Sequence, residues 1–346
     1  MAEVAFPHVL SLTITNACNL RCRMCGQWGQ TGYMKSGDAH AEHLPLSVWR
    51  KVIDEWADHG RTFVGLRGGE PFLYPEIIPL LAHIKDRGLD VSIDSNGTLL
   101  GRFAEDVARL QIDNINVSVD GPEDVHDRVR GVPGAYSKIR EGVRAVREAC
   151  ARKGQASPVR TICFVIGPDS YRSLPDMPDV ARELGVSGLA IVPYYYFDDP
   201  AGARHEEIMM KEFGCRAASW RGFRRESSGV DPDVFRAAYR DFRSRLGGVQ
   251  LVPYMDFSED DYVAWFSDCV TVVGRSNCTN PQKLLDIQPN GDANTCVDFP
   301  DFIIGNATRE SIEALWNSEQ ARAFRAYLGK RQLPVCLRCG AKYMSG

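Results

Sequence analysis

The sequence has no hydrophobic run approaching the roughly 20 apolar residues that a membrane-spanning helix needs. Its N-terminus lacks the basic region and long apolar core of a secretory signal peptide. The net charge is only −4, so no basic excess favours nucleic acid as a partner. Internal repeats, low-complexity tracts and blocks of like charge are missing too. These absences predict a cytoplasmic globular protein that binds neither membranes nor nucleic acid.

Cysteine, in contrast, is abundant, with 11 in 346 residues. Disulfides are rare in the cytoplasm, so clustered cysteines there indicate a metal site or catalysis. One group lies near the N-terminus, one crowds the last quarter and three cysteines are scattered. In that order they are Cys18, Cys22 and Cys25; Cys269, Cys278, Cys296, Cys336 and Cys339; and Cys150, Cys163 and Cys215.

The first group has the spacing Cys18-x3-Cys22-x2-Cys25 and directly follows an apolar, β-branched run that predicts a strand. Three thiolates can hold three irons of a 4Fe–4S cube and leave the fourth iron open for a substrate. Zinc sites usually pair one C-x2-C group with a second, distant one, a symmetry that this triplet lacks. An iron–sulfur cluster is therefore the favoured prediction and zinc the alternative.

From residue 8 to about 196, apolar strands alternate with amphipathic helices. This alternation predicts an α/β fold with parallel strands and right-handed crossovers. A partial (β/α)6 barrel and an open doubly wound sheet both fit, and both gather functional residues at the carboxyl ends of the strands. The predicted strands are Val9–Thr15, Phe63–Arg67, Leu89–Asp94, Ile115–Val119, Val159–Ile166 and Gly188–Tyr194.

Apolar residues at helical spacing predict the helices, and Thr308 is a candidate N-cap for a helix that runs to about Leu328. An Asn290-Gly291 turn between two short apolar runs predicts a β-hairpin near the C-terminus. The other predicted helices are Ser47–Trp56, Glu76–Arg87, Ser137–Ala151, Pro175–Leu184 and Val234–Leu246.

Polar and glycine-rich segments follow the predicted strands. Gly68 and Gly69 would let a ligand approach the backbone closely, and Glu70 adds an acceptor for an ammonium group, although a plain tight turn is the alternative. Ser95 follows the third strand. Ser118 and Asp120 lie two residues apart on the fourth, so they are expected on one face. These positions predict a site at one edge of the sheet.

The cysteine triplet resembles the signature of the radical S-adenosylmethionine (SAM) superfamily. The resemblance implies a partial (β/α)6 TIM-like barrel and a 4Fe–4S cluster whose open iron chelates SAM. One electron would cleave SAM into methionine and a deoxyadenosyl radical, which takes a hydrogen atom from the substrate. The resemblance also implies the SAM contacts. These are Met24 at the adenine, Gly68, Gly69 and Glu70 at the amino group, and Ser118 and Asp120 at the ribose and carboxylate. Ser95 is a further SAM-binding candidate, and Arg130 is expected at the carboxylate, with a structural salt bridge as its alternative.

The pattern Cys278-x12-Gly291-x4-Cys296 resembles the opening of a SPASM domain. Only Cys336-x2-Cys339 follows, which resembles the shortened twitch form. The resemblance implies a second, auxiliary 4Fe–4S cluster held by these four cysteines. Four cysteines in two groups also suit a zinc site, so zinc stays an alternative here. Cys269 is left over as a ligand, a free thiol or a hydrogen-atom donor to a substrate radical.

The resemblance implies three regions: a barrel over residues 1–200, a connecting helical and acidic region over 201–264, and a small hairpin-and-helix cluster domain over 265–346. Only 17 residues precede Cys18, too few for the N-terminal peptide-recognition domain of many peptide-modifying relatives. The connecting region is acidic, which indicates either a solvated face or a site for a cation. Its acidic residues are Asp198, Asp199, Glu206, Glu207, Asp256, Glu259, Asp260 and Asp261.

These features favour a radical SAM oxidoreductase or epimerase of natural-product biosynthesis. Its expected substrate is a small polar molecule, such as a cationic sugar or aminocyclitol, and its expected electron donor is a flavodoxin or ferredoxin. The alternative is a peptide- or protein-modifying enzyme of the crosslinking or sulfatase-maturase kind. A zinc-stabilised binding protein without chemistry is the remote alternative.

Overall fold

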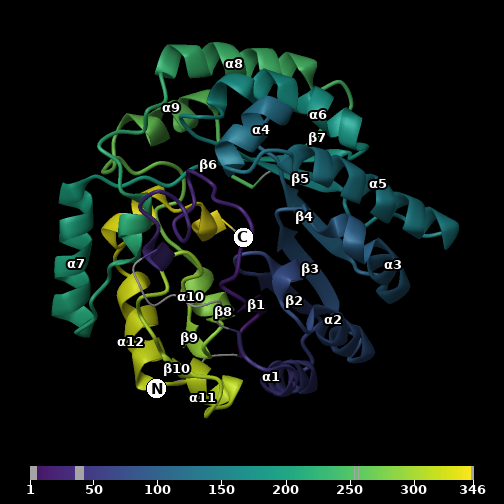
Figure 1. The fold of residues 1–346 in the computed structure, drawn as a ribbon. Helices are drawn as coiled ribbons and strands as arrows, with labels where there is room; N and C mark the ends of the chain where they lie inside the picture. Colours follow the sequence, from purple (N-terminus) through teal and green to yellow (C-terminus); the bar gives the residue numbers. More distant parts are fainter. Residues whose placement is uncertain (1–5, 36–42, 253, 256, 344–346) are drawn as a thin grey trace.

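The computed structural model describes residues 6–35, 43–252, 254–255 and 257–343. One sheet of ten strands, ordered β10-β9-β8-β1-β2-β3-β4-β5-β6-β7, forms its centre (Figure 1). Strands β8 and β1 to β7 run parallel, whereas β9 and β10 pair antiparallel. The strands are β1 Val9–Thr13, β2 Phe63–Arg67, β3 Asp90–Ser95, β4 Asn114–Ser118, β5 Thr161–Ile166, β6 Gly188–Pro193, β7 Gln250–Val252, β8 Leu284–Ile287, β9 Asp292–Asn294 and β10 Gly305–Asn306.

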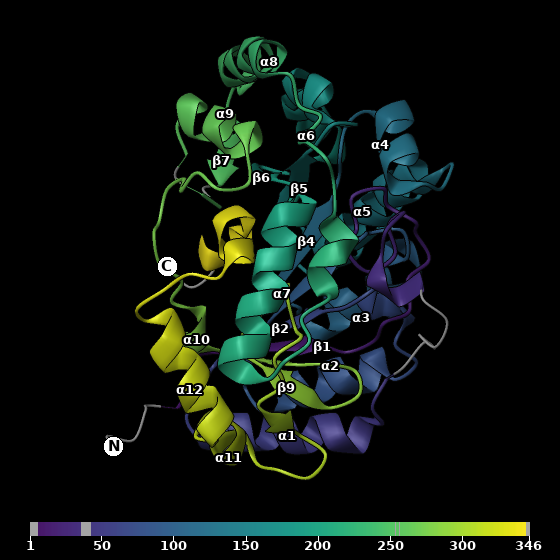
Figure 2. The same ribbon diagram turned by 90° about the vertical axis from the view of Figure 1, so that its left-hand side faces the viewer.

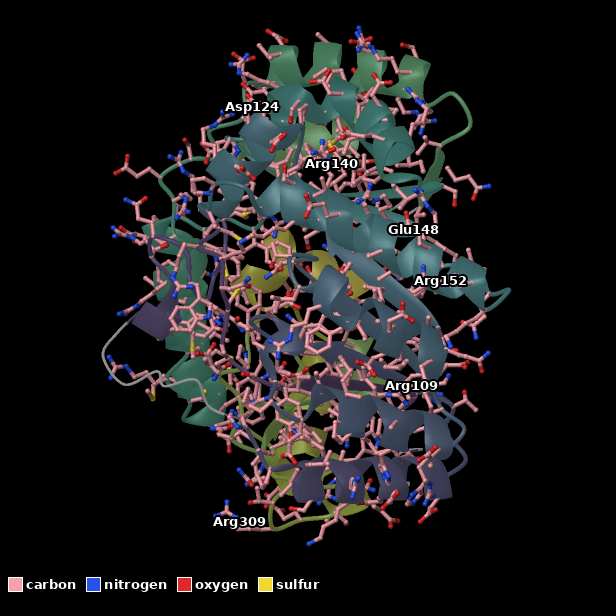
Figure 3. All side chains as sticks on the ribbon, turned by 45° about the vertical axis from the view of Figure 1, so that its right-hand side comes forward. Arg109, Asp124, Arg140, Glu148, Arg152 and Arg309 are labelled. Carbon is pink, nitrogen blue, oxygen red and sulfur yellow. The ribbon has the colours of Figure 1, made fainter. Side chains whose placement is uncertain are left out.

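Helices cover the convex side of this curved sheet. Figure 3 shows the outer surface, where exposed side chains such as Arg109, Glu148 and Arg152 point to solvent. Helices α7 and α12 lie beside each other at the opposite side of the molecule (Figures 1 and 2). The helices are α1 Leu46–Asp58, α2 Ile77–Asp86, α3 Leu100–Leu110, α4 Glu123–Arg130, α5 Ala135–Arg152, α6 Met177–Leu184, α7 Asp199–Phe213, α8 Pro232–Arg245, α9 Glu259–Ser267, α10 Asn280–Lys283, α11 Ile312–Trp316 and α12 Glu319–Leu328.

Burial alternates along the central strands. On β5, Ile162, Phe164 and Ile166 are fully buried, whereas Cys163 and Val165 are only partly buried. Successive side chains of a strand point to opposite faces, so the first set packs under the helices and the second faces the hollow of the sheet. This inner face is the one available to ligands.

The predicted partial barrel is confirmed, and all six predicted strands are present within a few residues of their expected bounds. The short run after Val249 forms β7, and the hairpin at Asn290-Gly291 forms β8 and β9. The hairpin joins the main sheet, because β8 pairs in parallel with β1, with Leu285 opposite Leu10. The cysteine loop after β1 therefore lies between the C-terminal strands and β2.

The helix expected from Thr308 to Leu328 was wrong in two respects. The chain forms two helices, α11 and α12, and their N-caps are Ser311 and Ser318, whose side chains accept bonds from the backbone of Ala314 and Ala321. Because Ser318 caps the start of a new helix inside the apolar pattern, the pattern does not form one continuous helix. Helix α3 follows β3 and was not among the predicted helices. Within the described residues, none of the helices is long and apolar enough to cross a bilayer.

Candidate active site

The three N-terminal cysteines line one cavity of about 280 Å³ at the carboxyl ends of the parallel strands. Their loop is tied to the end of α4, because the backbone N–H groups of Arg21 and Arg23 donate to the carbonyls of Arg130 and Val129. The Sγ of Cys25 accepts from the backbone N–H of Trp28 at 3.3 Å. Backbone donors and packing therefore set where these thiols lie.

Gly68 and Gly69 bring the loop after β2 directly against the cysteine loop. The backbone N–H of Gly69 donates to the carbonyl of Thr15 at 2.9 Å. A Cβ on Gly68 would lie 2.4 Å from that same oxygen, and one on Gly69 would lie 2.2 Å from the carbonyl oxygen of Ala17. Gly68 also has a φ of +153°, which residues with a side chain rarely adopt. Both glycines line the cavity, as the sequence predicts.

Glu70 is fully buried, and it lines neither the cysteine cavity nor the second cavity that adjoins it. Its carboxylate accepts from Ser95 Oγ at 2.9 Å and from the backbone N–H of Asn96 at 2.7 Å. Burial raises the pKa of Glu70 to about 7, although these bonds and one from the N–H of Phe72 favour the charged form. Glu70 therefore holds the loop after β2 against the loop after β3, and its role at the SAM amino group stays a prediction.

Asp120 is also fully buried and lines neither cavity, and its role as a SAM contact stays a prediction. Strand β4 ends at Ser118, two residues before Asp120. Asp120 Oδ2 pairs with Arg130 Nε at 2.6 Å, and Oδ1 accepts from the backbone N–H of Val165. The structural salt bridge considered for Arg130 is therefore present.

Arg130 also reaches the cavity, where its Nη1 donates to the Sγ of Cys22 at 3.8 Å. Met24, Ser95 and Ser118 line the same cavity, and their roles as SAM contacts stay predictions. Burial raises the pKa of Cys22 to about 12, partly offset by Arg130. A free thiol there is protonated at neutral pH, so metal binding must displace its proton.

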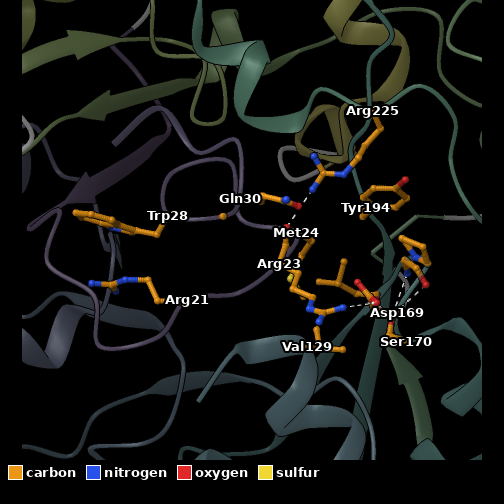
Figure 4. A pocket seen from close by; sticks show the side chains of 14 residues that line it. Arg21, Arg23, Met24, Trp28, Gln30, Val129, Asp169, Ser170, Tyr194 and Arg225 are labelled. Atoms are coloured by element: carbon orange, nitrogen blue, oxygen red, sulfur yellow. Dashed lines mark hydrogen bonds and ion pairs between the residues drawn. The ribbon is translucent and has the colours of Figure 1, made fainter. Parts of the chain in front are cut away.

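A second cavity of about 520 Å³ adjoins the first, and the two share Met24, Trp28 and Val165 (Figure 4). Arg21 and Arg23 of the cysteine loop line it, together with Arg225. Sequence reasoning missed this wall, because Arg225 lies 200 residues from the loop and no motif marks it.

The four C-terminal cysteines line a separate cavity. Cys278 precedes α10, Cys296 follows β9, and Cys336 and Cys339 flank the end of a 3-10 helix, Pro334–Arg338. Burial raises the pKa of Cys336 to about 12, and the pKa values of Cys296 and Cys339 are raised well above the usual range by burial and by neighbouring cysteines. The fold thus gathers the four residues that the second pattern singles out.

Arg67, Asp298 and Tyr195 connect the two cysteine cavities. Arg67 lines the first cavity, and its Nη2 lies 3.3 Å from Asp298 Oδ1. Tyr195 Oη donates to Asp298 Oδ2 at 3.0 Å and accepts from the backbone N–H of Ala341, two residues after Cys339. Sequence reasoning missed this link. The position of Arg67 at the end of β2 was the available signal.

Cys269 lines none of these three cavities and is buried, with its Sγ 3.6 Å from the carbonyl oxygen of Tyr196. This placement argues against the roles of hydrogen-atom donor and cluster ligand that the sequence left open. Cys163 faces the hollow side of β5 but lines neither of the two adjoining cavities, and Cys215 donates to the carbonyl of Asp301.

Most acidic residues of the connecting region that the structure describes are engaged in ion pairs or helix caps. Asp199 pairs with Arg224, Glu206 with Arg221, and Glu259 with Arg236 and Arg240. Asp198 and Asp261 serve in helix caps. Asp256 lies outside the described residues. The solvated-face interpretation therefore describes this region better than a cationic pocket does.

The two cysteine groups fit clusters rather than single ions. Within the described ranges, no three His, Cys, Asp or Glu side chains converge on one ion position. Zinc needs sulfur atoms at about 2.3 Å from one centre. In an iron–sulfur cube each thiolate binds a different iron, so the ligands surround a larger object. The three and the four thiols that line the two cavities are the donor sets that such clusters need.

The radical SAM family model matches residues 12–178, and the model of the SPASM iron–sulfur cluster-binding domain matches residues 278–340. The chain belongs to the radical SAM superfamily. Its cofactors are a SAM-binding 4Fe–4S cluster, SAM and an auxiliary iron–sulfur cluster of the SPASM region. This result excludes the zinc-stabilised binding protein. The twitch form of the SPASM domain and the domain bounds stay predictions.

Among individual proteins, the chain is 29% identical to the AdoMet-dependent heme synthase of Nitratidesulfovibrio vulgaris, over 93% of this chain and 83% of that one. It is 24% identical to the PqqA peptide cyclase of Granulibacter bethesdensis, over 98% and 81%. A heme synthase of Methanosarcina barkeri is 31% identical, but the match spans only 40% of that protein. Streptococcus suis SuiB, bound to its precursor peptide SuiA, shares the fold with a TM-score of 0.64 at 16% identity, over 98% of this chain and 71% of SuiB.

Proposed function

We propose that this radical SAM enzyme modifies a peptide by removing a hydrogen atom from one of its carbons. The observation that carries the proposal is the cavity of about 520 Å³ beside the cluster cavity. It shares Met24, Trp28 and Val165 with that cavity, so a substrate held there lies next to bound SAM. Its volume falls in the range of about 300–1,000 Å³ for ligand sites, enough for a few residues of a peptide.

The similarity to a peptide cyclase over most of both chains supports a peptide over a sugar. The cavity itself opposes the cationic sugar or aminocyclitol expected from the sequence. Its wall carries three arginines, and a positive field repels a cation. Oxidation, epimerisation and crosslinking all begin with the same hydrogen abstraction, and the peptide proposal does not depend on which of them follows.

When bound, the two clusters and SAM supply a deoxyadenosyl radical and a second site for an electron. The chain's own residues hold and orient these groups. Cys18, Cys22 and Cys25 hold the first cluster. Gly68 and Gly69 let SAM approach the backbone between the loops after β1 and β2.

Ser118 and Met24 line the remaining wall of the SAM cavity, where Met24 separates SAM from the substrate cavity. Cys278, Cys296, Cys336 and Cys339 hold the auxiliary cluster. The link through Arg67, Asp298 and Tyr195 keeps the two sites in a constant relative position.

A tetrapyrrole with carboxylate side chains is the second candidate substrate. The similarity to a heme synthase over 93% of this chain favours it, and the arginine-lined wall suits carboxylates as well. The two candidates differ in the kind of molecule that must lose a hydrogen atom, which an isotope experiment separates.

The test uses the anaerobically reconstituted protein with SAM and dithionite. Pools of peptides, porphyrins and amino sugars, each deuterated at carbon, are offered in turn. Deuterium in the deoxyadenosine product identifies the molecule that supplied the hydrogen. Transfer from peptides supports the proposal. Deuterium transfer only from porphyrins, or only from amino sugars, contradicts the proposal. The Cys18/Cys22/Cys25→Ala variant is the control that should produce no deoxyadenosine.

A further inference from the structure

Three guanidinium groups converge on the substrate cavity from two distant segments. Arg21 and Arg23 belong to the cysteine loop, and Arg225 follows the 3-10 helix Ser219–Phe223. Arg225 Nη2 donates to the carbonyl of Arg23 at 3.0 Å, which joins the segments (Figure 4). Gly222 and Gly26 allow this approach, since a Cβ on Gly222 would lie 2.1 Å from the carbonyl oxygen of Gly26. The positive wall is thus a built feature of the fold.

The charge of this wall is only partly neutralised. Arg23 Nη1 pairs with Asp169 at 3.0 Å. In the part of the chain that the structure describes, no carboxylate pairs with Arg21 or Arg225. Arg21 uses Nη1 for the carbonyls of Cys18 and Leu20 and stacks on Trp28, with its Cζ 4.9 Å from the ring centroid. Two positive charges of fixed position therefore face the cavity without an acidic partner.

The rest of the cavity is mixed, with the polar side chains of Gln30, Asp169 and Ser170 beside apolar ones. Met24, Val129, Val165 and the ring of Tyr194 line it, and the hydroxyl of Tyr194 is taken by the carbonyl of Ser228. The Ser170 hydroxyl donates to the carbonyl of Val165 and accepts from the backbone N–H of Gly167. An apolar floor with a few fixed charges is typical of a site that orients an amphipathic ligand.

We infer that this cavity binds its substrate through a carboxylate placed beside the carbon that loses hydrogen, with Arg21 and Arg225 as the residues that select for it. This inference rests on the proposed function and names the substrate class: a peptide with an Asp or Glu side chain next to an apolar residue. Guanidinium groups suit carboxylates, because their fixed fork of donors matches the two oxygens.

The test measures dissociation constants for the SAM-bound holoenzyme with two matched pairs of probes. One pair is the peptides Ac-Glu-Phe-Glu-amide and Ac-Gln-Phe-Gln-amide. The other is coproporphyrin III and its tetramethyl ester. Variants are Arg21→Gln and Arg225→Gln, each with a lysine counterpart that retains the charge. Arg128→Gln, at an exposed arginine on α4 outside the cavity, is the matched control.

The expected result is about tenfold tighter binding of the acidic peptide than of the glutamine peptide, weakening with salt. Each glutamine variant should weaken acidic-peptide binding about threefold, a typical size for a partly solvated ion pair. The lysine variants should recover part of the loss, and Arg128→Gln should change nothing. Equal affinity for both members of both pairs overturns the inference. Charge-dependent binding of the porphyrin alone supports the anion site and overturns the peptide proposal.

Discussion

Asp120 and Arg130 form an ion pair, with 2.6 Å between Oδ2 and Nε, in the interior between the SAM cavity and α4. Asp120 is 0% exposed and the Arg130 side chain is 10% exposed. Arg130 extends from this pair to the Sγ of Cys22. A buried carboxylate thus fixes a cation beside a thiol that we assign to the first cluster, and several properties of the protein should depend on this relationship.

Arg130→Gln should lower the free energy of unfolding by about 3–5 kcal/mol, because it leaves the buried Asp120 carboxylate without its positively charged partner. It should also lower the reduction potential of the first cluster, since hydrogen bonds and positive charge near the sulfurs favour the reduced state. Urea unfolding and a redox titration followed by EPR measure the two effects. Arg109→Gln, which breaks the exposed pair with Asp106, is the control and should cost less than about 1 kcal/mol.

The iron content should follow the two cysteine groups independently. The anaerobically reconstituted protein should hold about eight irons, and the Cys18/Cys22/Cys25→Ala variant about four. Serine at Cys163 or Cys269 should leave the parent content unchanged, because neither lines a cysteine cavity. Iron and sulfide assays check this. A parent with about four irons and a triplet variant with none would rule out the auxiliary cluster.

The contribution of Glu70 to stability should depend on pH. Its pKa is raised from 4.5 to about 7 by burial, so the folded protein holds this proton more tightly than the unfolded chain does. The stabilisation is therefore fully present below pH 4.5 and is lost as the pH rises through about 7. Its size is about 3 kcal/mol. Urea unfolding from pH 4.5 to 8 should show a fall in stability that Glu70→Gln removes. Parallel curves for the two proteins would contradict the shift.

Tyr195→Phe should lower stability and change the EPR signal and reduction potential of the auxiliary cluster. The change leaves Asp298 Oδ2 and the N–H of Ala341 without their partner, which costs about 1–3 kcal/mol. The EPR signal and potential of the auxiliary cluster should shift, and those of the first cluster should not. Tyr74→Phe is the matched control, because its buried hydroxyl also donates to a backbone carbonyl, that of Leu44, and it does not line the cavity of the four cysteines. An unchanged auxiliary signal in Tyr195→Phe would count against the link.

Several site residues were predictable because they combine a distinctive residue type with a place at a strand end. The cysteine triplet, Gly68, Gly69 and Ser118 all line the cavity as expected. Glu70 and Asp120 were singled out correctly, but their side chains turn into the protein. Spacing along a strand predicts a face only while the strand lasts, and both residues lie just beyond a strand end.

The sequence by itself determined the cysteine groups, the alternation of strands and helices and the radical SAM resemblance, because these depend on residue type and short-range spacing. Only the tertiary structure decided the character of the substrate cavity. Arg225 reaches Arg23 through the packing of two glycines, and the acidic residues of the connecting region are used in ion pairs and helix caps. The acidic connecting region therefore indicated a cationic substrate, whereas folding places positive charge at the cavity that we assign to the substrate, since a cavity is lined by residues that are distant in sequence.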